Sequence, residues 1–339
     1  MGKTGALRGS DEMVMPDIGR SKISIIILNW NGKKWLGDCL TSILGQDLDE
    51  PFEVLLVDNG STDDSVQYVE ERFPRVRVIE LGKNYGFAEG NNRGLKYAQG
   101  EYLVFVNMDT RAENGWLKNL LEAAHQYPSC HILCSMQLPA QAGNRVMSLN
   151  SFGDVTVAQQ ESYQYVTDSL FASGACFLIR RGWVEKLGYL FDPYYFCMAE
   201  DVEMSLRTIL MGGVIGYVRD SRIHHHVGGA QFPSFWAFSF RTRNLLLTYY
   251  KLFTPKNFAR MLLAHFLYIA AGLAANSRTA KKTLGMMKGL ADFFTCFYRY
   301  ETYRRRFIQK KKRRDEYVFE RFLHKEGVQE ALMKFIYRC

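Results

Sequence analysis

Apolar runs alternate with amphipathic segments from Ser24 to about residue 128. Four of the runs are nearly continuous in β-branched and other apolar residues, as is typical of strands buried on both faces, at 23–30, 52–60, 75–81 and 101–109. The segments between them repeat at helical spacing and predict helices at 36–44, 61–73 and 91–98. Buried strands that alternate with helices predict an α/β fold with a doubly wound, mostly parallel sheet.

Polar side chains follow each of the four predicted strands at the point where it ends. They are Asn29 to Asn31, Asp58 to Gly60, Asn84, and Asn107 to Asp109. The carboxyl ends of parallel strands meet at one edge of a sheet, where open α/β sheets bind their ligands. Four such clusters in succession therefore predict a ligand site at this edge.

The pattern changes twice more along the chain. Strands and loops continue through 172–181 and 214–226, with a helix around 200–213, and long aromatic and aliphatic helical stretches follow Phe232. We therefore expect a flexible segment at 1–21, an α/β domain at 22–231 and a helical region at 232–339.

The 339 residues suffice for one large domain or two modest ones, and charge is unevenly distributed between the two regions. From Arg241 to the end there are 22 Lys and Arg against 7 Asp and Glu, whereas residues 1–240 hold 21 and 28. A basic region joined to an acidic one predicts that the basic part faces an anionic surface. No nucleic-acid-binding module accompanies the basic run at 304–314, so a membrane is the preferred partner and nucleic acid is not expected.

The seven cysteines are odd in number, scattered and without a Cys-x-x-Cys pair, which favours neither a disulfide framework nor a zinc ribbon. A reducing, cytoplasmic setting fits them best. The first 20 residues contain no apolar stretch of the kind that a secretory signal requires.

Three polar clusters are candidates for chemistry. Asn107 and Asp109 supply oxygen ligands of the kind that Mg²⁺ and Mn²⁺ prefer, although Asn and Asp are also common in plain turns. Glu200 and Asp201 stand at a predicted helix start, where acids also complement the helix dipole, and either carboxylate could act as a general base. An imidazole from the run 224–226 could complete a metal shell begun by Asp109.

The segment 84–94, NYGFAEGNNRG, is rich in glycine but does not spell Gly-x-Gly-x-x-Gly. The missing fingerprint disfavours a Rossmann oxidoreductase. Asn91 and Asn92 within the segment are suited to cap the helix expected to follow them.

Six ordered motifs over residues 22 to 245 resemble family 2 glycosyltransferases of the GT-A fold, especially the bacterial rhamnosyltransferase-like branch. They are SIIILNWNGKKWLGDCLTSILGQ, VLLVDNGSTDDS, NYGFAEGNNRGLKYAQGEYLVFVNMDT, FASGACFLIRR, FDPYYFCMAEDVEMSLR and RIHHHVGG. The resemblance implies a nucleotide-sugar half at 22–128 and an acceptor half at 129–231. It also implies an inverting transfer of sugar from a nucleotide diphosphate to an acceptor hydroxyl, with dTDP-rhamnose favoured by the branch alone.

The resemblance assigns roles to individual residues. Asp58 would hold the base or ribose with help from Asn31 and Asn84, and Asp201 would be the catalytic base with Glu200 beside it. Asp109 would bind Mg²⁺ or Mn²⁺ together with His225, although its neighbours His224 and His226 leave the register open. The donor-binding residues expected in full are Asn29, Asn31, Asp58, Asn59, Asn84, Gly86, Phe87, Asn91, Asn92 and Asn107.

The resemblance further implies acceptors that are often sugars on polyprenyl diphosphate carriers, in cell-surface polysaccharide synthesis. Residues 261–277 carry no Asp, Glu, Lys or Arg and lie at the lower limit of length for a membrane span. We expect helices lying peripherally or monotopically on the anionic cytoplasmic face of the plasma membrane. A helical subdomain packed on the catalytic core is the alternative.

A nucleotide-sugar-binding protein whose site has lost catalysis is the main alternative function. The presence of both Asp109 and Asp201 argues against it.

Overall fold

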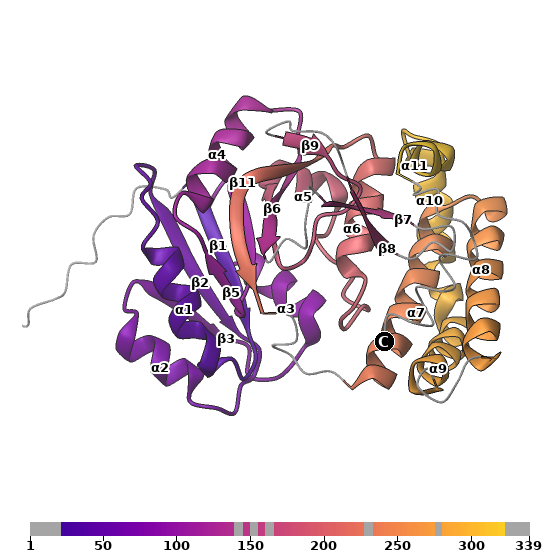
Figure 1. The fold of residues 1–339 in the computed structure, drawn as a ribbon, viewed down its shortest axis with the longest axis horizontal. Coiled ribbons are helices and arrows are strands. Elements are labelled where there is room, and N and C mark those ends of the chain that lie inside the picture. Colours follow the sequence, from indigo (N-terminus) through magenta and orange to yellow (C-terminus); the bar gives the residue numbers. More distant parts are fainter. Residues whose placement is uncertain are drawn as a thin grey trace, which may run out of the picture.

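A computed structural model of the chain describes residues 22–138, 145–149, 155–159, 166–226, 233–274 and 280–322 (Figure 1). The segment 1–21, for which we expect flexibility, lies outside the described residues, as do 227–232 and 323–339.

The first four strands form the parallel sheet that the sequence predicts. They are β1 (Ile23–Asn29), β2 (Phe52–Asp58), β3 (Val76–Glu80) and β4 (Tyr102–Asn107), in the order β3-β2-β1-β4. Asn29 pairs with Asp58, and Leu28 pairs with Asn107, so the polar strand ends do meet at one edge.

Beyond β4 the sheet is mixed rather than parallel. The further strands are β5 (Thr110–Ala112), β6 (Ile132–Leu138), β9 (Val166–Asp168), β10 (Cys176–Arg180) and β11 (Ile215–His225). Strand β10 runs antiparallel between β4 and β6, while β11 is parallel to β6 and antiparallel to β5 and β9. Strands β7 (Arg145–Leu149) and β8 (Val155–Gln159) form a separate antiparallel pair.

Both faces of the sheet are covered by helices, as the apolar strands require. In β1, Ile25 and Ile27 face one core while Ile26 faces the other, because successive side chains alternate across a strand. The core under Ile25 includes residues of α1 (Lys33–Leu44), α2 (Ser65–Arg72) and α4 (Trp116–Gln126). The core under Ile26 includes residues of α3 (Gly86–Leu95), α5 (Arg181–Leu187) and α6 (Glu200–Leu210).

The C-terminal region is helical, as expected. Its elements are α7 (Ser234–Leu252), α8 (Pro255–Ala274), α9 (Ala280–Cys296), the 3₁₀-helix η2 (Phe297–Tyr300), α10 (Glu301–Lys310) and α11 (Asp315–Phe322). Helix α7 lies between α6 and the outer helices α8 and α9 (Figure 1). Leu245, Leu246 and Tyr249 of α7 belong to the same buried cluster as the residues of α6, so the core runs without a break from the sheet into the helical region.

Candidate active site

The turn after β2 is built around Asp58 and Asn29. Asp58 is buried, and its Oδ2 accepts hydrogen bonds from the backbone N–H groups of Gly60 (3.1 Å) and Ser61 (3.0 Å). The Asn29 amide donates to Asp58 Oδ1 (2.9 Å) and to Ser65 Oγ (2.9 Å), which joins the ends of β1 and β2. Buried Asp58 therefore stabilises the conformation of this turn.

Asn31 and Asn84 lie on either side of that turn. Asn31 is exposed, and its Oδ1 accepts from the backbone N–H of Thr62 at 2.7 Å. Buried Asn59 donates to Asn84 Oδ1 (3.0 Å) and to the Gly86 carbonyl (3.1 Å). The predicted donor-binding turns after β1, β2 and β3 are thus held together by their own asparagines.

Helix α3 begins at Gly86, five residues earlier than the sequence predicts, so Asn91 and Asn92 do not cap it. Part of the reason is local, since Gly86 adopts φ +81 and its N–H bonds to Asn84 Oδ1 at 2.8 Å. Inside the helix, Asn91 donates back to the Phe87 carbonyl at 2.9 Å and Asn92 donates to the Phe191 carbonyl at 2.8 Å.

Helix α3 also contacts the loop that precedes α6. The Phe87 N–H donates to the Phe196 carbonyl at 2.6 Å, and a side chain at Gly86 would collide with that same carbonyl. The Phe87 ring lies 5.8 Å from the ring of Phe191. These contacts bring Gly86, Phe87 and Asn92 against the 191–196 segment, which the sequence did not indicate.

Among the three consecutive histidines, His225 is the one whose ring faces Asp109. Its Nε2 lies 3.3 Å from Asp109 Oδ1, and both side chains are largely buried. His224 Nε2 lies 3.0 Å from Glu113 Oε1 instead, and the His226 ring stacks on Trp35 at 4.9 Å. The pairing of β11 with β5 sets this register, because His225 stands opposite Thr110.

The Asp109–His225 pair fits a divalent cation. Two ligands of one such ion, each at about 2.1 Å, lie roughly 3 Å apart, close to the separation of these two atoms. The described residues contain no group of three or more His, Cys, Asp and Glu that could enclose a metal, so other ligands would come from the substrate diphosphate and water. Asn107, whose backbone N–H bonds to the Ala175 carbonyl at 2.9 Å, stands two residues away.

Asp201 and Glu200 open α6 after a left-handed turn. Met198 and Ala199 have φ +72 and +64, a conformation that costs non-glycine residues about 1–3 kcal/mol each. Asp201 Oδ2 accepts from the Gly174 N–H at 3.0 Å, and Oδ1 accepts from the Val202 N–H at 2.8 Å.

Burial raises the pKa of both carboxyls. For Glu200 the neighbouring charge of Asp201 raises the pKa further. For Asp201 the Gly174 and Val202 N–H groups and the Arg241 charge partly offset the rise in pKa. One Glu200 oxygen is buried without a hydrogen-bond partner within the described residues. Two adjacent carboxyls with raised pKa values are suited to accepting a proton.

A two-residue bridge connects the Asp109 region to Asp201. The Asn107 N–H bonds to the carbonyl of Ala175, and the N–H of the preceding Gly174 bonds to Asp201. The strand end that leads to Asp109 is thereby joined through the 174–175 segment to the start of α6.

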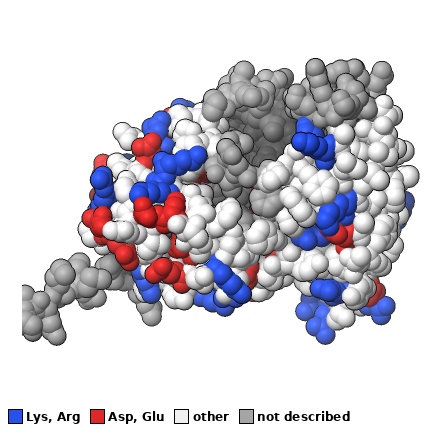
Figure 2. Space-filling model, turned by 90° about the horizontal axis from the view of Figure 1, so that it is seen from below, with Lys and Arg blue, Asp and Glu red and all other residues white. Residues whose placement is uncertain are grey.

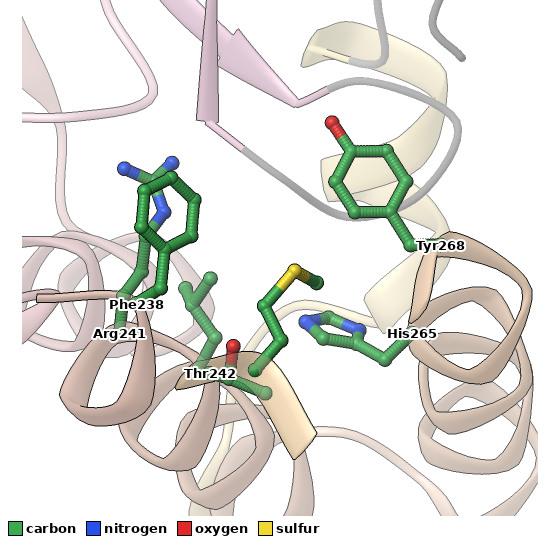
Figure 3. A pocket seen from close by; sticks show the side chains of 7 residues that line it. Phe238, Arg241, Thr242, His265 and Tyr268 are labelled. Atoms are coloured by element: carbon green, nitrogen blue, oxygen red, sulfur yellow. The ribbon is translucent and has the colours of Figure 1, made fainter. Parts of the chain in front are cut away.

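A small cavity of about 20 Å³ lies among the C-terminal helices, with Phe238, Arg241 and Thr242 of α7 on one wall and His265 and Tyr268 of α8 on the other (Figure 3). Space of that size holds about one water molecule. Asp109, His225 and Asp201 do not line it. One of its lining residues, Arg241, is connected with the candidate site, because its charge lowers the pKa of Asp201.

Comparison with known proteins shows which protein family has a sequence like that of this site. Residues 24–188 match the family described as Glycosyl transferase family 2, and these residues include the turns after β1, β2 and β3 as well as Asp109. The chain carries a family 2 glycosyltransferase domain. The protein is therefore a glycosyltransferase enzyme, and it is 28% identical over 208 residues to an N-acetylglucosaminyl-diphospho-decaprenol L-rhamnosyltransferase of Mycobacterium tuberculosis. That match covers 52% of this chain and 67% of the relative.

Solved glycosyltransferases share the fold. GalNAc-T7 with UDP, GalNAc and Mn²⁺ superposes with a TM-score of 0.61 at 16% identity, over 85% of this chain and 57% of that one. S. aureus TarS in complex with UDP-GlcNAc gives 0.55 at 19% identity, over 83% of each chain. The expected GT-A glycosyltransferase fold is thus confirmed.

Two features of the candidate site could not be predicted from the sequence. Gly174 contributes a backbone N–H, and backbone donors leave no mark in residue type. Asn244 donates its amide to the carbonyls of Cys197 (2.9 Å) and Met198 (2.6 Å), which are the residues just before the acid pair. An amide within the otherwise apolar run 244–247 was the only available signal.

Proposed function

We propose that this glycosyltransferase is metal-dependent and inverting, and that it transfers a sugar from a nucleotide diphosphate to a hydroxyl of a lipid-linked glycan in cell-surface polysaccharide synthesis. The observation that carries the proposal is that Asp109 and Asp201 are both attached to the end of β4. Asp109 faces His225, and Asp201 is joined to the same strand end through Gly174 and Ala175.

The donor would lie across the carboxyl edge of β1, β2 and β4. Asn31 and Asn84 stand at the rim of the turn that Asp58 supports, where they can contact the base and ribose. Asp109 and His225 would hold Mg²⁺ or Mn²⁺, which when bound neutralises the charge of the departing diphosphate.

Asp201 would act as the general base. It takes the proton of the acceptor hydroxyl as that oxygen bonds to the anomeric carbon, while the bond from that carbon to the diphosphate breaks. The raised pKa of Asp201 brings its proton affinity closer to that needed near neutral pH. Glu200 would assist Asp201 from the adjacent position, and one of its oxygens is buried without a hydrogen-bond partner among the described residues.

A lipid-linked acceptor is supported by the M. tuberculosis relative, whose name specifies a decaprenol diphosphate substrate and rhamnose transfer. We propose the same class of acceptor here and dTDP-rhamnose as the first donor to test. The reaction would then take place at the cytoplasmic face of the membrane, where the carrier lipid lies.

The outer face of α8 and α9 supports membrane contact. The exposed large apolar side chains of these helices recur at helical spacing, and they are Leu263, Phe266, Leu267, Leu273, Leu284, Met287 and Phe294. Lys256, Arg260 and Lys281 are exposed on the same two helices, and the helical half of the surface in Figure 2 shows mainly blue clusters. Apolar faces with cations beside them bind anionic lipid surfaces.

Helix α8 is better suited to lie on the membrane than to cross it. It is the one helix in the described part of the chain that is long and apolar enough to span, with a mean hydropathy of 1.3. However, Met261, His265 and Ile269 are buried, and the helix packs on both α7 and α9. A spanning helix would have to leave these contacts.

The basic run at 304–314 contributes less to the surface than its composition predicts. Arg304 is buried and donates to the Tyr250 carbonyl, and Arg313 donates to the Gly213 carbonyl at 2.8 Å. These cations fasten α10 and the turn after it to α7 and to the end of α6.

Transfer assays with a panel of nucleotide sugars test the main proposal. The purified protein should transfer sugar from at least one donor to a polyprenyl-diphosphate-linked acceptor in the presence of Mn²⁺. Chelation should remove the activity, and added Mn²⁺ should restore it, because the diphosphate would otherwise leave without charge compensation. Nucleotide-sugar binding with neither transfer nor donor hydrolysis would instead support a catalytically degenerate binding protein.

Vesicle sedimentation tests the membrane proposal. The double variant Phe266→Glu and Leu284→Glu should lose most of its binding to vesicles rich in anionic lipid, because it places two charges in the apolar face. Tyr97→Glu changes an exposed aromatic residue of the α/β domain and is the control, expected to bind like the unmodified protein. Equal binding of all three proteins would contradict the proposal.

A further inference from the structure

Three buried polar side chains form a stripe along one face of α7. They are Asn244, Thr248 and Lys251, all with 0% exposure. Their spacing of four and three residues places them on the same side of the helix. This side faces the loop that leads into Glu200 and Asp201, and each of the three residues bonds to a different point of that loop.

Lys251 holds the beginning of the loop. Its ammonium lies 2.6 Å from Asp192 Oδ2 and 2.9 Å from Glu203 Oε1. Asp192 belongs to the loop and Glu203 to α6, so one cation joins the two ends of the segment that contains the acid pair.

Thr248 holds the middle of the loop. Its hydroxyl donates to the Asn244 carbonyl at 2.8 Å and lies 2.9 Å from the Tyr195 hydroxyl. Because the threonine proton is used within the helix, the tyrosine is the donor in the second bond.

Asn244 holds the end of the loop, where the backbone is left-handed. Its Oδ1 accepts from Arg243 Nε at 2.9 Å, which orients its NH₂ group toward the carbonyls of Cys197 and Met198. Met198 and Ala199 are the two non-glycine residues with positive φ immediately before Glu200. A conformation of this kind persists only where its surroundings impose it.

We propose that α7 positions the catalytic base: Asn244, Thr248 and Lys251 hold the 192–199 loop in the conformation from which Asp201 meets the Gly174 N–H and the acceptor. The inference rests on the proposed function only in naming Asp201 as the base. It makes the helical region a part of the active site as well as a support for membrane contact. Asn244 is the positioning residue closest to the chemistry.

The decisive variant is Asn244→Asp, which keeps the size of the side chain but sets a carboxylate against two carbonyl oxygens. Ser239→Ala is the matched control, because Ser239 is also a buried polar residue of α7 but lies against Gly289 of α9. Thr248→Val, which removes one hydroxyl at nearly constant volume, replaces Asn244→Asp if that variant does not fold.

Two measurements separate this inference from the proposed function. Hydrogen exchange of the 192–201 amides should be faster in Asn244→Asp than in Ser239→Ala, with exchange in β1 to β4 unchanged. This comparison requires no catalytic activity, so it holds even if no donor is found. Equal exchange in the two variants would overturn the inference.

The second measurement is kinetic. Asn244→Asp should lower kcat for transfer by about 10- to 100-fold, with Kd for the donor nucleotide within about twofold of the unmodified value. In an Asp201→Asn background the same change should cause no further loss, because the base that it positions is already gone. An unchanged kcat, or a loss that persists in the Asp201→Asn background, would contradict the positioning role.

Discussion

Replacing Asp201 by Asn should reduce sugar transfer by about 10²–10⁴-fold, the usual contribution of a general base. The substitution preserves the size of the side chain but removes the carboxylate that would take the proton from the acceptor hydroxyl. Gly174 and Val202 each donate to a different Asp201 oxygen, so the neutral amide also loses one of these two bonds. The initial transfer rate and the Kd of the nucleotide, measured by calorimetry on the same preparation, together check the result.

Binding of the nucleotide should stay nearly unchanged, because the role proposed for Asp201 concerns the acceptor and not the donor. Asp220→Asn is the matched control, since Asp220 is a partly exposed carboxylate that pairs with Arg219 and Arg222. In the unmodified enzyme the rate should fall on the acid side as Asp201 takes up its proton. Because burial raises the pKa of Asp201, that fall should begin at a higher pH than for an ordinary aspartate. Full transfer activity in Asp201→Asn would remove this residue from the role.

Lys251→Met should lower the free energy of unfolding by about 3–5 kcal/mol, the cost of leaving one side of a buried ion pair without its partner. The methionine fills similar volume, but Asp192 and Glu203 lose the cation between them. Burial alone would raise the pKa of Glu203, yet the charges of Arg207 and Lys251 hold it below the usual range. Urea unfolding at pH 7 measures the difference.

The pH dependence of that loss has a definite sign. A carboxyl whose folded-state pKa is lowered stabilises the fold above its unfolded pKa, and the contribution disappears as pH falls through the folded value. The difference in free energy of unfolding between Lys251→Met and the unmodified protein should therefore become smaller as the pH falls. Lys288→Met, which breaks a half-exposed pair with Asp292, should cost no more than about 1 kcal/mol. A loss of stability in Lys251→Met as small as that expected for Lys288→Met would contradict the prediction.

The donor half of the fold could be predicted because its information is local. The β1, β2 and β4 runs are largely apolar, and the polar residues that end them must meet once the strands are parallel and in register. The antiparallel direction of β10 could not be predicted in the same way, because a short apolar run gives the same pattern in either direction. The early start of α3 depends on Gly86 and on the distant Phe196 carbonyl, which helical spacing does not reveal.

The acceptor side was less predictable because its contacts join residues far apart in sequence. Asn244 reaches carbonyls 46 and 47 residues earlier, and Lys251 reaches Asp192 over 59 residues. The excess of Lys and Arg after residue 240 predicts a cationic surface that binds an anionic partner. Composition did not show that Arg304 and Arg313 point inward to carbonyl oxygens, or that Lys251 lies in the core.

Glycines bring α9 against α7. A side chain at Gly285 or Gly289 would meet the backbone carbonyl of Phe235 or Ser239 at 2.3 Å, so the two helices lie almost in backbone contact. If the outer face of α9 lies on lipid, two helix thicknesses of rigid protein separate the headgroups from Asp201. The enzyme would then work at a fixed height above the bilayer. Hydroxyls within that reach of the carrier lipid would be accepted, and those at the far end of a long glycan would not.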